Sequence, residues 1–224
     1  DLALQRGECL GVVGESGSGK SVTALSLLGL VASPPGVITG GAVRLNGEDL
    51  LSVDMESLRS IRGGRVSYIF QDPLATLHPL YRVGDQLVEA IQCHQPVSQK
   101  EAWARSVALM DQVQIPNAES RARSYPHELS GGMRQRISIA LALANDPELI
   151  IADEPTTALD VTVQAQILAL LVELQKKRNM AMIFITHDFG VVAQLCDRIA
   201  VMYGGRIVET GPTEEILNNP AHPY

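Results

Sequence analysis

The stretch GESGSGKS at residues 14–21 decides how this sequence folds, because it fits the phosphate-binding loop pattern GxxxxGK[ST]. A triphosphate needs many hydrogen-bond donors at close range, and glycines let backbone N–H groups turn inward without an obstructing side chain. Lys20 adds a mobile positive charge, and Ser21 adds a hydroxyl ligand for Mg²⁺. The pattern predicts a protein that binds a nucleoside triphosphate.

The segments on either side of this loop agree with that interpretation. The apolar run at 9–13 predicts a buried strand, and residues 22–30 predict a helix whose positive N-terminal end faces the phosphates. The alternative is a glycine-rich turn with an incidental lysine, and the order strand, loop, helix argues against it.

Composition narrows the class of protein. The 224 residues are enough for one large domain, and the net charge of −7 argues against a general nucleic-acid or anionic-lipid surface. Cys9, Cys93 and Cys196 show no CxxC spacing, which suggests neither a disulfide framework nor a zinc site and favours a reducing compartment. Because the chain starts at Asp1 rather than methionine, we expect a piece of a longer product that is truncated at its N-terminus.

Alternation of strand and helix signals predicts an α/β fold with a mainly parallel sheet. Apolar runs recur at 9–13, 66–70, 149–152, 182–185 and 199–202. Residues 42–47, which end in an Asn-Gly turn, predict a small antiparallel arm. Between residues 72 and 145 the strand signals fade, and helices are expected at 83–94, 100–113 and 133–144. This region is interpreted as an inserted helical subdomain.

A second chemical motif closes the apolar run at 149–152, where Asp153 and Glu154 follow directly. Parallel sheets present their chemistry at the carboxyl ends of their strands. Asp153 is therefore expected to hold Mg²⁺, directly or through water, and Glu154 to polarise an attacking water. Taken alone, the pair could also be a solvated acidic strand end.

A third motif, LSGGMRQ at 129–135, places a serine and two bare glycine amides at the start of a helix. In isolation an ordinary serine N-cap is the simpler explanation. This helix start and the one after residues 14–21 could both bind anions, but one nucleotide seldom needs two such helix ends from the same chain. Two such domains that meet head to tail, each completing the nucleotide site of the other, would account for both helix ends.

At this point the residues resemble an ATP-binding cassette domain over essentially the whole chain. Residues 14–21 match the Walker A loop, Gln71 the Q-loop, 129–133 the signature and 149–154 Walker B. The last two matches are Ala158-Leu159-Asp160 with the D-loop and His187 with the switch histidine. The family implies a P-loop NTPase (RecA-like) core, with core residues 1–71 and 146–224 and a signature subdomain at 72–145.

The amino-acid sequence of several segments is similar to that of dipeptide, oligopeptide and nickel importers. These segments are 71–73, 129–136, 152–166 and 220–224. Met133 stands where most cassettes have glutamine, a replacement that is common in this subfamily. Cassettes of such importers continue beyond the point where Tyr224 ends, so the resemblance implies that the domain is also truncated at its C-terminus. The implied function is ATP hydrolysis that powers a peptide importer, with a nickel or glutathione-type importer, a soluble cassette ATPase, or a module that senses ATP without turnover as alternatives.

The resemblance also implies a set of site residues and two ligands, ATP and Mg²⁺. The catalytic residues would be Glu154, His187 and Gln71, and the metal ligands Ser21, Gln71 and Asp153. ATP would contact Gly14, Ser16, Gly17, Ser18, Gly19, Lys20 and Ser21. Contacts to the ATP of the opposing cassette would come from Ser130, Gly131, Gly132 and Asp160.

The same resemblance implies partners and a location. A second cassette, expected to be a paralogue, two transmembrane permease subunits and a periplasmic or extracellular solute-binding protein would complete the assembly, with no nucleic acid. Residues 74–81 resemble the surface that receives the permease, although they could equally be a plain connecting loop. The chain is expected at the cytoplasmic face of the inner membrane, as a peripheral subunit.

Overall fold

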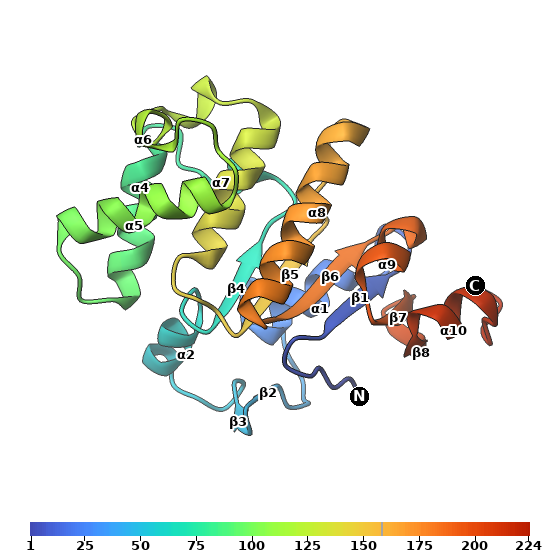
Figure 1. The fold of residues 1–224 in the computed structure, drawn as a ribbon. Helices are drawn as coiled ribbons and strands as arrows, with labels where there is room; N and C mark the ends of the chain where they lie inside the picture. The colour runs from blue at the N-terminus through green and yellow to red at the C-terminus, as the bar shows by residue number, and fades with distance from the viewer. Residues whose placement is uncertain (158) are drawn as a thin grey trace. The chain divides into compact units, whose positions relative to one another are not determined.

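The structure is a computed structural model that describes residues 1–157 and 159–224. The chain divides into two compact units, one made of residues 1–8 and 63–182 and the other of residues 9–62 and 183–224. Figure 1 shows the order of the elements along the chain.

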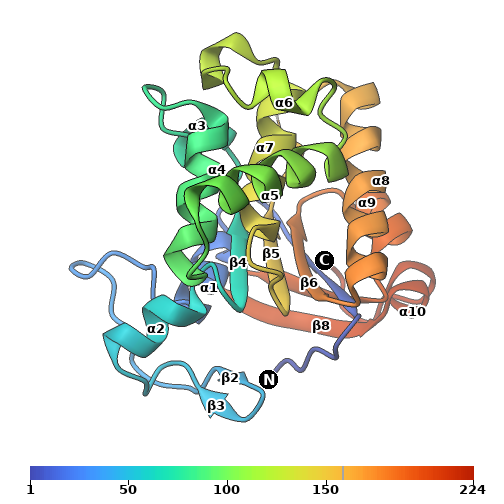
Figure 2. The same cartoon turned by 60° about the vertical axis from the view of Figure 1, so that its left-hand side comes forward.

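The first unit combines two strands with most of the helices. Its elements are β4 (Val66–Ile69), α3 (Pro73–Thr76), α4 (Val83–His94), α5 (Gln99–Gln112), α6 (Ala118–Arg121), the 3₁₀ turn η1 (Pro126–Glu128), α7 (Gly131–Leu143), β5 (Leu149–Asp153) and α8 (Val161–Arg178). β4 and β5 pair in parallel, with Tyr68 opposite Ile151. The helices α4, α5 and α7 lie side by side, as Figures 1 and 2 both show.

Local sequence explains why these helices form where they do. In α4 the buried residues Val83, Leu87 and Ile91 recur every four positions and give the helix one apolar face. Helix α8 begins where the Asp160 carboxylate accepts a hydrogen bond from the N–H of Val163. It ends at Asn179, whose left-handed conformation (φ 48°) stops the helix after a basic last turn.

The second unit is built around β1 and the C-terminal strands. Its elements are β1 (Cys9–Val13), α1 (Lys20–Leu27), β2 (Arg44–Leu45), β3 (Glu48–Asp49), α2 (Met55–Ile61), α9 (Phe189–Leu195), β7 (Arg198–Tyr203), β8 (Arg206–Pro212) and α10 (Thr213–Asn218). β1 pairs in parallel with β7, and β7 pairs antiparallel with β8. Strand β6 (Ala181–Thr186) begins in the first unit and continues into the second.

Most of the predicted elements are confirmed, with shifted ends. The helix predicted at 83–94 is α4 residue for residue, and the small arm is the β2–β3 hairpin, where Asn46 and Gly47 both have positive φ. The helix predicted at 22–30 instead runs from Lys20 to Leu27. Strand β8 was not predicted, although the pair Gly204-Gly205 that joins it to β7 is a recognised hairpin turn.

Candidate nucleotide site

The phosphate-binding loop joins β1 to α1 in the second unit. Every residue of β1 is buried, so the loop starts from a fixed point. Gly14 has no room for a side chain, since a Cβ there would lie 2.2 Å from the carbonyl oxygen of Met202. Gly17 and Gly19 have φ values of 81° and 97°, a conformation that L side chains rarely adopt. The glycines of the motif are therefore required by the backbone path of the loop.

Two side chains of this loop are arranged to receive an anion. The Lys20 Nζ donates to the carbonyl oxygens of Gly14 and Glu15 at 2.8 and 2.9 Å, which holds a buried ammonium group inside the loop. The Ser18 Oγ is buried and has no hydrogen-bond partner among the described residues. A buried hydroxyl and a buried cation in one loop fit the phosphate groups of a nucleotide.

His187 is exposed and lies directly after β6, at the entrance to α9. The turn that carries it is fixed by its neighbours. Asp188 accepts hydrogen bonds from the N–H groups of Gly190 and Val191, and its own N–H donates to the Thr186 hydroxyl. The imidazole therefore stands on a rigid turn in the same unit as the phosphate-binding loop.

The predicted general base occupies a fixed position in the first unit. Glu154 follows β5 and has a φ of 44°, an uncommon value for a residue with a side chain. Its carboxylate oxygen Oε2 accepts hydrogen bonds from the Gln71 side-chain amide at 3.1 Å and from the Thr157 hydroxyl at 2.9 Å. Two donors from separate segments thus orient the carboxylate.

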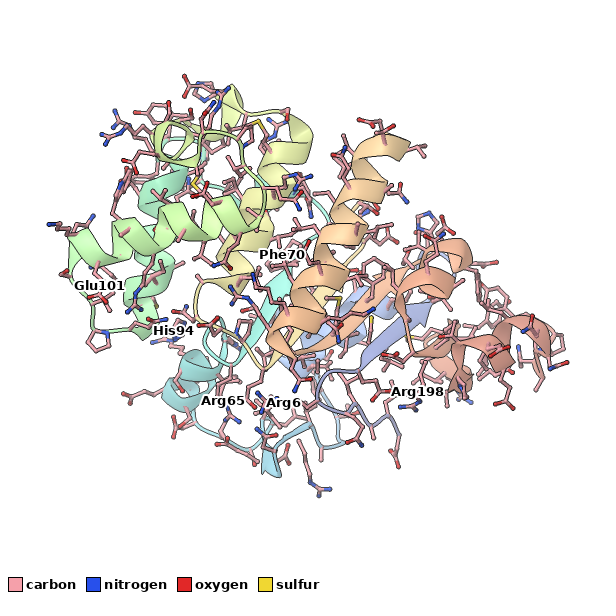
Figure 3. The ribbon with its side chains drawn as sticks, viewed as in Figure 1. Arg6, Arg65, Phe70, His94, Glu101 and Arg198 are labelled. Atoms are coloured by element: carbon pink, nitrogen blue, oxygen red, sulfur yellow. The ribbon has the colours of Figure 1, made fainter. Side chains whose placement is uncertain are left out.

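Asp153, the last residue of β5, is buried and makes a contact that the sequence analysis did not predict. The Tyr68 hydroxyl donates to its Oδ2 atom at 2.8 Å. Burial, and secondly the hydrogen bond to Asp153, raise the pKa of Tyr68. The phenol therefore keeps its proton and remains the donor in this pair. Phe70, labelled in Figure 3, comes directly after β4 and packs on the Tyr68 ring with centroids 4.6 Å apart.

The signature residues lie where α7 begins. The Ser130 Oγ accepts the N–H of Met133 at 3.3 Å, so the N-cap expected from the sequence is present. Gly131 and Gly132 form the first turn of the helix, and a Cβ on Gly132 would lie 2.7 Å from a methyl group of Val163 in α8. Asp160 caps α8, while Ala158 lies outside the described residues.

Within the first unit the structure brings together Gln71, Asp153 and Glu154, as the carboxyl ends of adjacent parallel strands require. Sequence reasoning missed Tyr68 and Thr157. The signal for Thr157 was its place three residues after Glu154, within reach of a turn. Tyr68 could be found only from the register of β4 against β5. Within the second unit, Lys20 and Ser21 open α1.

The donor set is compatible with Mg²⁺. Among the described residues, no three histidine, cysteine or acidic side chains come together in a way that could hold a metal ion. Mg²⁺ does not need such a cage, because it keeps several waters and binds through one or two carboxylates together with substrate phosphates. The buried Asp153 of the first unit and Ser21 of the second unit each carry the kind of oxygen ligand that this chemistry uses. No helix in the described part of the chain has the length and apolar character needed to cross a bilayer.

Comparison with known proteins places these motifs in one family. Residues 1–157 match the family described as ABC transporter. The oligopeptide transport ATP-binding protein OppD of Bacillus subtilis is 52% identical over 221 residues, which cover 99% of this chain and 62% of that protein. OppD of Salmonella typhimurium is 51% identical over 224 residues, which cover all of this chain and 66% of that protein. The chain belongs to the ABC transporter family.

Solved structures agree with this assignment. The ATP-binding cassette MJ0796, solved as a dimer in a post-hydrolysis state with ADP and Pi, superposes with a TM-score of 0.82 at 28% identity, covering 95% of this chain and 88% of that one. The cassette cbiO1 of Clostridium perfringens, part of the transporter complex cbiONQ, also gives a TM-score of 0.82, at 26% identity, and covers 97% and 82% of the two chains. The α/β fold with its mainly parallel sheet is that of the ABC ATPases.

Proposed function

We propose that this chain is the ATP-hydrolysing domain of a subunit that powers an ABC importer for dipeptides or oligopeptides. The observation that carries the proposal is about 50% identity to two oligopeptide transport ATP-binding proteins over at least 99% of this chain. That match spans the positions of every motif on which the ATP chemistry depends. The chain spans about two thirds of the length of these relatives, so the activity of the whole protein is part of the proposal.

In the proposed reaction each side chain has a separate task. Glu154, oriented by Gln71 and Thr157, takes a proton from the attacking water. Lys20 and the amides of the phosphate-binding loop stabilise negative charge on the β- and γ-phosphates, and His187 donates to the γ-phosphate.

Mg²⁺, when bound, supplies positive charge to the phosphate oxygens. Ser21, Asp153 and Gln71 are the residues that would hold it. The ATP itself would contact the residues assigned from the sequence, namely Gly14, Ser16, Gly17, Ser18, Gly19, Lys20 and Ser21. The Ser18 hydroxyl is buried and has no hydrogen-bond partner in the described part of the chain, which supports this assignment.

The proposal includes a head-to-tail pair of cassettes. Ser130, Gly131, Gly132 and Asp160 would contact the ATP bound by the opposing cassette, which we infer to be a paralogue. The dimeric MJ0796 cassette supports a paired arrangement. In functional terms, residues 72–145 would act as the signature subdomain and residues 1–71 and 146–224 as the nucleotide-binding core.

Two permease subunits and a solute-binding protein would complete the importer, with this chain on the cytoplasmic face of the membrane. Exposed apolar side chains support a docking surface for the permease. Leu74, Leu80 and Tyr81 are 52%, 76% and 59% exposed, and they follow the Q-loop glutamine within ten residues. Exposed apolar side chains that lie close together in the sequence support an interface at this segment.

The test is reconstitution of the complete protein with its permease subunits and solute-binding protein in lipid vesicles. ATP hydrolysis is measured with an oligopeptide, a dipeptide, Ni²⁺ or glutathione added to the binding protein. Stimulation by peptides alone is the expected result. Stimulation only by Ni²⁺ or glutathione would show that this solute, and not a peptide, is transported. Failure to associate with any permease would indicate a soluble ATPase.

A further inference from the structure

The register of two strands places a tyrosine beside the carboxylate that is expected to serve the metal ion. Tyr68 of β4 lies opposite Ile151 of β5. Since side chains two residues apart share a face of the strand, Asp153 lies on the same face as Ile151 and diagonal to Tyr68. A long aromatic side chain can span this diagonal, and the Tyr68 hydroxyl does so with a hydrogen bond of 2.8 Å to Asp153 Oδ2.

The tyrosine is held firmly enough to act as a fixed donor. Its ring packs against Phe70, with centroids 4.6 Å apart and ring planes inclined by 39°. The accepting carboxylate is only 6% exposed, so bulk water competes little for the bond. A carboxylate that accepts a bond from a fixed donor is restricted in its orientation before a metal ion binds.

We propose that Tyr68 is a positioning residue, which orients the Asp153 carboxylate for the metal ion that enters with ATP. This inference rests on the proposed ATPase function and names a residue outside the family motifs quoted above. Removal of a side chain that hydrogen-bonds a metal-ligating carboxylate commonly weakens metal binding by about 10–100-fold. The hydroxyl of Tyr68, rather than its ring, carries the effect.

The test compares the Glu154→Gln variant with the double variant Glu154→Gln/Tyr68→Phe. Glu154→Gln is present in both to prevent turnover. Mn²⁺ is the probe, and its binding in the presence of ATP is followed by the loss of the free-ion electron paramagnetic resonance signal. Tyr68→Phe is expected to raise the Mn²⁺ dissociation constant about tenfold. ATP binding measured in EDTA, where no metal takes part, stays unchanged.

Two further variants separate positioning from packing. Tyr224→Phe removes a hydroxyl from an exposed tyrosine with no assigned role, and it should leave Mn²⁺ binding unchanged. Tyr68→Leu removes the ring as well as the hydroxyl. If packing alone mattered, Tyr68→Leu would lose metal affinity while Tyr68→Phe kept it to within about twofold, and the proposal would be wrong.

A matching measurement in the hydrolysing protein keeps this inference distinct from the proposed function. With Glu154 intact, the Mg²⁺ concentration for half-maximal hydrolysis should rise in Tyr68→Phe, while the ATP concentration for half-saturation at excess Mg²⁺ should not. Normal hydrolysis by the wild-type chain with unchanged metal dependence in Tyr68→Phe would overturn only the role of Tyr68. A wild-type chain that neither binds nor hydrolyses ATP would overturn both.

Discussion

At the scale of single residues, the backbone of Glu154 is under strain. A left-handed conformation at a residue with a side chain costs on the order of 1–3 kcal/mol and persists only where the surroundings impose it. Here the N–H of Thr157 donates to the Glu154 carbonyl oxygen at 3.1 Å, while the Thr157 hydroxyl holds the carboxylate. The turn thus directs the carboxylate toward the Gln71 amide, an orientation that a regular continuation of β5 would not give.

Replacement of Glu154 by glutamine should separate ATP binding from hydrolysis. The amide keeps the size of the side chain but cannot accept a proton, so turnover should fall by about 10²–10⁴-fold while ATP affinity is retained. Phosphate release and calorimetric titration measure the two quantities. Glu148→Gln, on the surface in an ion pair with Arg65, is the matched control and should hydrolyse ATP normally. Near-normal turnover in Glu154→Gln would refute the assignment of the base.

At the scale of elements, the start of α7 packs closely against α8. A Cβ at Gly132 would lie 2.7 Å from the Cγ1 of Val163, whose branched side chain has little rotameric freedom. A Cβ at the adjacent Gly131 would lie 3.7 Å from the nearest Leu159 atom, which is an ordinary van der Waals contact. Packing against α8 therefore excludes a side chain at Gly132 but not at Gly131.

Gly132→Ala should destabilise the first unit, and Gly131→Ala should not. Overpacking of this kind typically costs about 1–3 kcal/mol, so a lower thermal midpoint is expected for Gly132→Ala. Thermal unfolding followed by circular dichroism measures the difference. Equal midpoints for the two variants would mean that α7 and α8 accommodate the added methyl group without loss of stability, and the prediction would be wrong.

A second element-scale prediction concerns the residues after α10. The Glu209 carboxylate of β8 accepts hydrogen bonds from the N–H groups of Ala221 and His222 at 2.8 and 2.9 Å. These bonds, first the one from Ala221, lower the pKa of Glu209. A group with a lowered folded pKa stabilises the folded arrangement above its unfolded pKa and loses this effect as the pH falls through the folded value.

Protection of the Ala221 and His222 amides against hydrogen exchange should therefore be full at neutral pH. It should decline once the pH falls below 4.5, the ordinary pKa of a free glutamate. Protection factors, corrected for intrinsic exchange at each pH, provide the measurement. Glu209→Gln removes the titrating group and should abolish this pH dependence. An identical decline in that variant would assign the transition to another group.

At the scale of the whole molecule, the proposed contact of Ser130 with the ATP of an opposing cassette predicts a dimer of cassettes. This dimer should form when ATP is bound and not hydrolysed. The complete Glu154→Gln protein, alone or mixed with the second cassette of its transporter, should form a dimer with Mg·ATP and a monomer with ADP. Light scattering after size-exclusion chromatography measures the mass. Ser130→Arg should prevent pairing, whereas Ser120→Arg, at an exposed serine of α6, should not. Pairing that survives Ser130→Arg would place the interface elsewhere.

Much of the fold could be predicted because local patterns report local structure. The apolar period of α4 and the Asn46-Gly47 turn are properties of a few consecutive residues, and both elements appear as predicted. The ends of α1 and the existence of β8 were harder to predict. Strand β8 depends on its hydrogen-bonded ladder with β7. Helix ends such as those of α1 are less sharply defined than the middle of a helix.

The sequence by itself determined the family, the phosphate-binding loop, and the two carboxylates at the end of β5 and directly after it. Each of these is a pattern of contiguous residues whose chemistry allows few alternatives. Only the tertiary structure decided that Tyr68 bonds to Asp153 and that Gln71 and Thr157 share Glu154. Tyr68 and Asp153 are 85 residues apart in the chain. Their contact is set by the register of two paired strands, which is a property of the folded sheet and of neither strand alone.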